Sequence, residues 1–497
     1  MSRHTTQTAA AAATADETIQ ERQADPRRWY ALAVFLLPVL LISLNTYMIQ
    51  VALPSIQSSL QASFSEAQLM VSGFSLSLAV ALIVSGKLGD LYGRKRMLLI
   101  GVSGFTLMAA LGGMASDPAL LIALRIVQGI AAACIQPQVL SLMQVGFLPR
   151  EKGLVFAIYG ALIGLGFAFG LILGGILVHW NPFGLGWRTV FYFNVPFGGT
   201  VLLLLPFLPE AGTIRRRGRG QSIDWTGALL LTVGLFLLIY PLSEGQKRGW
   251  PLWTGGCLAA SVLLLLAFIT VQIRKRGCPS APLIDLSIFL RRTFRIGILT
   301  VITVYFSMFS FFFILSYYLQ FGLHYSMQLT SFAFLPLGCG FFLTSLLSSR
   351  IVSRWGITGL KAGALFMGGS TFLLIASLHC GSGQLLNAQA VLILLVYGCG
   401  LGMVTTPLAN VVLSTVTPEE AGTGSGLFTT FLYLSNSLGV ALTGILFTAS
   451  LGHPLTAAAA NDYVQAFSAS LTLTGGLAFA AFGLLCLLPG GEANSQD

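Results

Sequence analysis

The sequence predicts an all-helical membrane protein with fourteen transmembrane helices. Of its 497 residues, 55% are hydrophobic and 9% are charged, and the mean hydropathy is +0.82. An ordinary soluble domain is about a quarter charged, so a water-soluble fold is excluded. Apolar stretches of about 18 residues or more, long enough to cross a bilayer, recur along the whole chain. We therefore expect a polytopic protein surrounded by the lipid bilayer.

The apolar stretches give the expected helices in order. They begin near residues 30, 66, 97, 118, 154, 188, 225, 252, 295, 327, 361, 386, 422 and 464. Ser63 and Glu66 have the spacing of a capping box, which favours a helix start at the second stretch. Residues 1–28 are polar and rich in Ala and Thr, without an apolar core, so we expect a disordered tail rather than a signal peptide.

The basic residues predict the orientation. The net charge is +10. If the N-terminus is cytoplasmic, the inner segments hold most of the Lys and Arg, and the outer loops hold only Arg188, Lys247 and Arg248. The positive-inside rule then places both termini in the cytoplasm. We expect the protein to lie in the cell membrane. Because the charges orient helices, no nucleic-acid partner is expected.

The chain repeats itself. Both Pro149–Gly153 (PREKG) and Pro418–Gly422 (PEEAG) read Pro-x-Glu-x-Gly, and the glycines that follow them recur at Gly175 and Gly444. The offset equals about eight helices, which divides the fourteen into six, two and six. The expected parts are a cytoplasmic tail (1–28), an N-terminal six-helix bundle (29–209), linkers with two inserted helices (210–292; helices about 225–242 and 252–272), a C-terminal six-helix bundle (293–488) and a cytoplasmic tail (489–497). Repeated halves are typical of transporters.

The stretch GKLGDLYGRKR (Gly86–Arg96) lies between the second and third expected helices. Its glycines permit a tight turn and close helix approach. A basic loop that merely fixes topology explains Lys87 and Arg94–Arg96, but it does not explain the glycines or the single aspartate, Asp90.

This stretch resembles the signature loop of the major facilitator superfamily, Gly-x-x-x-Asp-[Arg/Lys]-x-Gly-[Arg/Lys]-[Arg/Lys]. The matching residues are Gly86, Asp90, Gly93, Arg94 and Lys95, and Leu91 departs from the pattern. The resemblance implies the major facilitator fold. It also implies that these residues form a gating latch, which joins the inner ends of the two halves in the outward-facing state.

Arg125 lies seven residues into the fourth expected helix, about 10 Å deep in the membrane. An arginine at that depth costs at least a few kcal/mol unless it is paired, so it is a functional candidate; the alternative is an arginine that snorkels to the interface. Leu121, Arg125, Gln128 and Gly129 match the family's Leu-x-x-x-Arg-x-x-Gln-Gly motif. The match implies a role for Arg125 and Gln128 in proton transfer or gating.

The fifth expected helix is rich in glycine, and close helix packing is the direct interpretation. It is also similar to the Gly-Pro-x-x-Gly-Gly motif of drug:proton antiporters. Gly170, Gly174 and Gly175 match that motif, whereas Leu171 replaces the proline. The stretches GWRTVFYFNVPFG (Gly186–Gly198) and IDWTGALLL (Ile223–Leu231) resemble the fourteen-helix drug-export branch.

The end of the first expected helix, LNTYMIQVALP, departs from that branch. Asn45 replaces its usual aspartate and Gln50 its usual asparagine, and no Asp or Glu lies in the middle of any expected helix. An amide can neither carry a proton nor neutralise a buried cation. We therefore place Asn45 and Gln50 in a substrate cavity that prefers neutral or weakly anionic molecules.

The ninth expected helix is aromatic nearly all round. Aromatic residues at this density pack in the interior or face lipid, and some of them are candidates for lining the cavity. The candidates are Tyr305, Phe309, Phe312 and Tyr317.

These features together predict a secondary transporter that exports hydrophobic or amphipathic small molecules. We expect a monomer with no cofactor and no metal site, driven by the proton gradient through alternating access of the two bundles. The alternative is an exporter or facilitator of one neutral or anionic metabolite without conventional proton coupling. A sensor or assembly partner is disfavoured by the latch motif and by Arg125. An enzyme is disfavoured because no His/Asp/Glu cluster lies at one depth, and ATP hydrolysis by this chain is disfavoured because it has no phosphate-binding loop.

Overall fold

The computed structural model describes residues 28–207, 224–245, 248–275, 283–284, 286–380, 385, 387–414, 416 and 421–488. This part is almost entirely helical and contains no β-strand. Fourteen of its helical segments are long and apolar enough to cross a membrane, and each begins within four residues of the start predicted from sequence. The fold class is confirmed. Residues 1–27 and 489–497 of the expected tails, and the greater part of PEEAG, lie outside the described residues.

The spans of the first half are α2 (Arg28–Leu60), α3 (Phe64–Tyr92), α4 (Arg94–Met114), α5 (Pro118–Ala133) continued by α6 (Gln136–Gly146), α7 (Pro149–Trp180), and α8 (Thr189–Tyr192) continued by α9 (Asn194–Leu204). Two further spans follow, α10 (Trp225–Gly245) and α11 (Leu252–Arg274). The second half contains α12 (Arg292–Tyr317), α13 (Met327–Leu346), the short α14 (Ser348–Trp355), α15 (Ile357–Cys380), α16 (Ala388–Leu413), α17 (Ala421–Leu451) and α18 (Ala460–Cys486). Short 3₁₀ or π turns flank them at Pro182–Gly184, Gly186–Arg188, Leu205–Phe207, Leu286–Leu290 and Tyr318–Gly322.

Local signals in the sequence start and stop several of these helices. The capping box of Ser63 and Glu66 is formed at the start of α3. Asp117 caps α5 by accepting a hydrogen bond of 2.9 Å from the Leu120 N–H, and Pro118 occupies the first turn, where a missing N–H costs nothing. Gly93 has a φ of 97°, which lets the chain turn sharply from α3 into α4.

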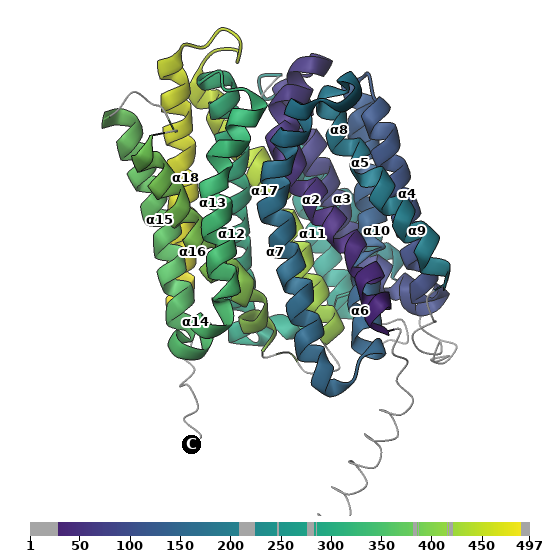
Figure 1. Cartoon of the computed structure of the whole chain (residues 1–497). Helices are drawn as coiled ribbons and strands as arrows, with labels where there is room; N and C mark the ends of the chain where they lie inside the picture. The colour runs from purple at the N-terminus through teal and green to yellow at the C-terminus, as the bar shows by residue number, and fades with distance from the viewer. Residues whose placement is uncertain are drawn as a thin grey trace, which may run out of the picture.

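Figure 1 shows the helices side by side, crossing the molecule in alternating directions. Because fourteen crossings are an even number, α2 begins and α18 ends at the same face. We call this the terminal face, and the other the opposite face.

The halves meet along two seams that repeat each other. The fifth span of the first half, α7, packs on the second span of the second half, α13; conversely, α17 packs on α3. At Gly175 of α7 a Cβ atom would strike Ser331 of α13, and at Gly444 of α17 it would strike Gln68 of α3. The glycine repeat in the sequence therefore corresponds to two equivalent close contacts between the halves.

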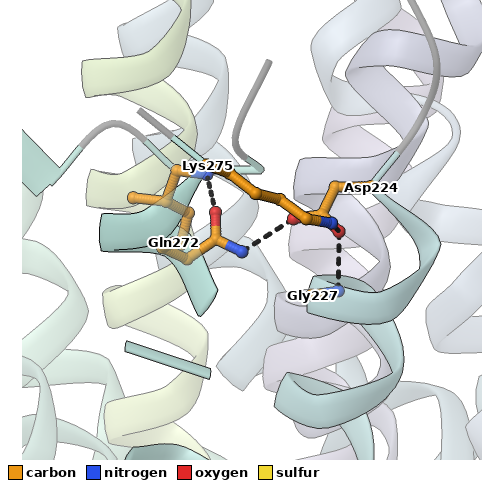
Figure 2. A network of polar contacts seen from close by, with 5 residues as sticks. Asp224, Gly227, Gln272 and Lys275 are labelled. Carbon is orange, nitrogen blue, oxygen red and sulfur yellow. Dashed lines mark hydrogen bonds and ion pairs between the residues drawn. The ribbon is translucent and has the colours of Figure 1, made fainter. Parts of the chain in front are cut away.

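The two inserted spans form an antiparallel pair, and α10 packs on both α3 and α17. Figure 2 shows how the pair is joined: Gln272 and Lys275 at the end of α11 reach Asp224 at the start of α10. The fully buried Asp224 carboxylate accepts hydrogen bonds from the Gly227 N–H (2.8 Å), Gln272 Nε2 (2.7 Å) and Lys275 Nζ (2.5 Å). Gln272 Oε1 in turn accepts from the Ile284 N–H at 3.1 Å, on the connection into α12.

The charge balance at Asp224 follows from these contacts. Burial opposes the charged form of the carboxylate. The hydrogen bonds from Lys275, Gly227 and Gln272, together with the Lys275 charge, outweigh burial and hold the pKa of Asp224 below its ordinary value. The aspartate and glycine of IDWTGALLL therefore cap α10 and tie it to α11.

Candidate transport site and gating elements

Arg125 is held where α5 lies against α3. A Cβ atom at Gly129 of α5 would strike the Phe74 carbonyl and Ser77 of α3, so only glycine allows the two helices to approach this closely. The approach brings the Arg125 side chain over the Phe74 ring, 4.0 Å from the ring centre, and Nε donates to the Met70 carbonyl at 3.1 Å.

Arg125 Nη1 also donates to Asn45 Oδ1 and to Gln128 Oε1, each at 2.7 Å. Arg125 is 2% exposed, and Asn45 and Gln128 are fully buried. The guanidinium therefore joins α2, α3 and α5 in the interior of the first half, and the snorkelling alternative is excluded. Three residues selected from the sequence (Asn45, Arg125 and Gln128) come together, whereas Met70 and Phe74 were missed because neither carries a distinctive motif.

Gln50 does not belong to this cluster. It lies on α2 and is fully buried, and neither atom of its amide has a hydrogen-bond partner in the part of the chain that the structure describes. The Nδ2 atom of Asn45 and the Nε2 atom of Gln128 are also buried without partners there. Buried amides are normally hydrogen-bonded, so the unsatisfied atoms of these three amides call for an explanation.

The aromatic candidates of α12 are all buried, which excludes lipid contact for these four side chains. Tyr305, Phe309, Phe312 and Tyr317 are at most 8% exposed. Phe309 and Phe312 contact Tyr47 of α2, with ring centres 5.9 and 6.4 Å apart. Tyr317 donates a hydrogen bond of 2.6 Å to Gln57 Oε1 of α2. The aromatic helix α12 therefore packs against α2 of the first half, and one of its contacts, Tyr47, lies two residues after Asn45 in the sequence.

The three motif glycines of α7 serve two different contacts. At Gly170 a Cβ atom would lie 2.8 Å from the Tyr47 Cβ, and at Gly174 it would lie 2.9 Å from the Met48 carbonyl, both on α2. Gly175 faces α13 instead, as the seam between the halves requires. One glycine-rich helix thus packs closely on a neighbour within its own half and on a neighbour in the other half.

In the described residues, the hydrogen bonds of Asp90 and Arg94 in the signature loop stay within the first half, whereas Lys87 lies close enough to Asp224 of the inserted pair to interact with its charge. Asp90 pairs with Arg94 at 3.3 Å, and the Asp90 side chain is 63% exposed. Arg94 donates to the Ser141 carbonyl and Lys95 to the Pro206 carbonyl. Gly89 leaves room for Gln138 of α6, while Gly86 has space around it. In this conformation, the described residues show no hydrogen bond or ion pair between Asp90 and the second half.

The α3–α17 seam carries polar contacts that sequence reasoning missed. From the opposite face inward, Gln68 Nε2 donates to the Val440 carbonyl (3.0 Å), Ser437 to the Ser72 carbonyl (2.5 Å), Asn436 to Ser75 Oγ (2.8 Å), and Thr430 to the Ala79 carbonyl (3.2 Å). The α3 positions 68, 72, 75 and 79 have helical spacing and share one face. That spacing of small and polar residues in an apolar span was the available signal.

Further polar contacts between the halves lie toward the opposite face. Gln320, in the π turn that follows α12, donates to the Val51 carbonyl of α2 at 2.9 Å, and Ser331 of α13 donates to the Leu171 carbonyl of α7 at 3.1 Å. Toward the terminal face, Gln136 Nε2 donates to the Tyr433 hydroxyl at 3.0 Å. The described contacts thus run from the opposite face past the middle of the membrane and stop short of the signature loop.

An apolar cavity of about 320 Å³ lies between α2, α7 and α9. Its lining consists of leucine and phenylalanine side chains, including Leu44, the residue before Asn45. Phe169 and Phe197 of this lining are partly exposed on the surface of the bundle. The described residues contain no group of three His, Cys, Asp or Glu side chains that could hold a metal ion.

Comparison with known proteins identifies the family. Residues 35–440 match the family model described as Major Facilitator Superfamily. The chain belongs to the major facilitator superfamily. The resemblance carried by the signature loop is confirmed, and the protein is a multi-pass membrane transporter rather than an enzyme.

Several curated members of the superfamily are similar over most of their length. A probable actinorhodin transporter of Streptomyces coelicolor is 34% identical over 433 residues, which is 87% of this chain and 74% of that protein. A puromycin resistance protein of Streptomyces alboniger is 34% identical, covering 85% of this chain and 82% of that protein. A multidrug resistance protein of Mycobacterium tuberculosis is 31% identical, covering 84% and 76%. This major facilitator protein is therefore of the antibiotic and multidrug exporter type.

Solved structures of the superfamily share the fold. A bacterial homolog of the human lysosomal transporter Spinster matches with a TM-score of 0.66 at 17% identity, covering 93% of this chain and 97% of that one. The xylose transporter XylE of E. coli matches with a TM-score of 0.62 at 16% identity, covering 94% and 99%. These likenesses support the major facilitator fold of the chain.

Proposed function

We propose that this exporter moves hydrophobic or amphipathic small molecules out of the cytoplasm by alternating access. The relatives named for antibiotic transport and multidrug resistance support the substrate class. The observation that carries the mechanism is the unequal contact between the halves. Polar contacts join them from the opposite face past the middle, while Asp90 at the terminal face forms its ion pair within its own half in the described part of the chain.

These unequal contacts at the two faces correspond to a transporter in which the two halves are closed together at the opposite face. In the other state of the cycle, the Tyr317–Gln57 and Ser331–Leu171 contacts would break, and the signature loop would join the second half near the start of α17. Asp90 suits that role because a carboxylate is favoured at a helix N-terminus. The two halves would rock as bodies about the α3–α17 and α7–α13 seams.

We also propose that the terminal face is cytoplasmic and that the membrane is the cell membrane. The basic residues Lys87 and Arg94–Arg96 lie at the terminal face, whereas Arg188 and Arg248 lie in connections at the opposite face. The positive-inside rule supports this orientation. The apolar lining of the cavity beside α2 suits a substrate that is itself apolar, and we propose that the transporter acts as a monomer.

The favoured energy source is the proton gradient, with the Arg125 cluster as the gating element. Asn45 cannot carry a proton, and its carbonyl is occupied by Arg125. That observation favours a second candidate function, an exporter or facilitator of one neutral or anionic metabolite without conventional proton coupling. In either case the protein needs no bound cofactor.

Purified protein reconstituted in liposomes tests the proposal. Uptake of a panel of neutral, anionic and cationic amphipathic dyes is measured with and without an imposed pH gradient. Accumulation that requires the protein and collapses when an ionophore removes the gradient is the expected result. Protein-dependent flux that ignores the gradient supports the facilitator instead, and an absence of flux for every dye contradicts export of this class.

A further inference from the structure

Arg125 is a buried cation without an acidic partner among the described residues. Its contacts are two amide oxygens, one backbone carbonyl and the face of Phe74. A charge removed from water costs several kcal/mol unless an opposite charge compensates it. The amide oxygens supply partial charges only, so the interior of the first half keeps a positive potential at this point.

The residues beside the guanidinium have more hydrogen-bond donors than acceptors. Because arginine only donates, Asn45 and Gln128 must turn their carbonyl oxygens toward it, which directs their NH₂ groups elsewhere. Those groups, Asn45 Nδ2 and Gln128 Nε2, are buried and donate to no residue in the described part of the chain. The hydrogen bonds of Arg125 leave from Nε and Nη1, so Nη2 is a third available donor.

The α3 segment 70–75 separates this cluster from the second half. One side of the segment contacts the guanidinium through the Met70 carbonyl and the Phe74 ring. Its other side accepts hydrogen bonds from Ser437 and Asn436 of α17. A ligand that reaches Arg125 past this segment therefore also disturbs the seam, which links occupancy of the cluster to the separation of the halves.

We propose that Arg125, Asn45 and Gln128 form an anion site that receives the acidic group of an amphipathic substrate. The inference rests on the proposed export function and names the substrate class. A carboxylate or phenolate oxygen accepts from Nη2, Nδ2 and Nε2 and supplies the missing negative charge. Permanent cations are repelled by the same potential. Two kinds of anion could occupy such a site: the acidic group of the substrate, or a small inorganic anion such as chloride. We propose that the occupant is the acidic group of the substrate.

The test is the binding of carboxyfluorescein, an aromatic carboxylate, to the whole protein in lipid nanodiscs, followed by fluorescence anisotropy. Asn45→Asp and Gln128→Glu each place a negative charge beside Arg125 with almost no change in volume. We expect either variant to weaken binding about thirtyfold, as the loss of a buried charge pairing does. Arg188→Gln is the matched control, because Arg188 also lies over an aromatic ring and donates to a backbone carbonyl, but in a connection at the opposite face.

Binding that is lost in both acidic variants and retained in Arg188→Gln supports the site. It does so even if the liposome assay finds no flux, in which case only the proposed function fails. Equal affinity in the wild type and Asn45→Asp overturns the site, as does an absence of dye binding. Repeating the titration in chloride and in gluconate distinguishes a site for the acidic group of the substrate from a site for an inorganic anion. Stabilisation of the protein by chloride that the dye does not compete with assigns the cluster to an inorganic ion and contradicts the proposal.

Discussion

Asn45 on α2 accepts a hydrogen bond of 2.7 Å from Arg125 on α5, and the two residues are 80 positions apart in the chain. Asn45 stands where the resemblance to the drug-export branch leads us to expect an aspartate. The interior of the first half therefore holds a full positive charge that only partial charges balance.

The first prediction concerns Asn45→Asp. The substitution brings the local charge from positive to neutral and adds a group that can exchange a proton for a cation. Ethidium export from cells should rise by about tenfold, which corresponds to ~1.4 kcal/mol, and should become steeper with external pH. The measurement is dye efflux at several pH values. Vigorous, gradient-driven ethidium efflux by the wild type would show that a carboxylate is unnecessary, for instance because aromatic contacts to the cation suffice.

Asp90→Asn tests the latch. Asp90 is exposed and pairs only with Arg94 among the described residues, and such a pair contributes about 0–1 kcal/mol to stability. The variant should therefore reach the membrane in normal amounts yet lose most of its flux, because the proposed latch uses the Asp90 carboxylate in the other state of the cycle. Asp117→Asn, which changes an exposed helix cap, is the control. Normal flux in Asp90→Asn would reduce the loop to a topological signal.

Much of the fold could be predicted because apolar length and basic charge act locally along the chain. The capping box at Ser63 needs only three residues of spacing, and Gln128 meets Arg125 because both lie on one face of α5. The partners from other helices could not be derived in that way. Met70 and Phe74 depend on how closely Gly129 lets α5 approach α3, and Asn45 was selected only through the resemblance.

The contacts between halves show the same limit. The glycine repeat indicated that α7 and α17 are equivalent, but not that Gly175 faces α13 while Gly170 faces α2. Aromatic residues all round α12 left interior and lipid-facing positions undecided. Their burial follows from the packing of α17, α18, α16 and α2 around that helix, which no local pattern encodes.

Gly175→Ala tests the α7–α13 seam. The added methyl group would strike Ser331 and lie 2.6 Å from the Met327 carbonyl, and a backbone atom cannot move aside cheaply. We expect the closed opposite face to become less populated, so that a cysteine introduced at Gln57 reacts several times faster with an impermeant thiol reagent. Gly160→Ala, on the same helix with open space around it, should leave the rate unchanged. Equal rates in the two variants would remove Gly175 from the seam.

Asp224→Asn tests the tie between the inserted helices (Figure 2). The substitution removes the charge that pairs with Lys275, and because the Lys275 side chain is 26% exposed, the loss should be smaller than the about 3 to 5 kcal/mol of a fully buried pair. The midpoint of thermal unfolding in detergent should fall. Because the folded state lowers the pKa of Asp224, its contribution is present above the unfolded pKa of about 3.9 and is lost as pH falls through the folded value. Asp224→Asn should therefore flatten the acid limb of the stability profile, and an unchanged acid limb would contradict the assignment.

Alternating access requires that the terminal face and the opposite face open in turn. Spin labels at Leu91 and Thr423 report the distance between the halves at the terminal face, and labels at Ser59 and His324 report it at the opposite face. All four positions are exposed in this structure. The distances are measured by pulsed electron–electron double resonance on the protein in nanodiscs, with and without a transported dye and at two pH values. The distance at one face should lengthen whenever the distance at the other face shortens. Distances that change together, or that do not respond to either variable, would contradict alternating access.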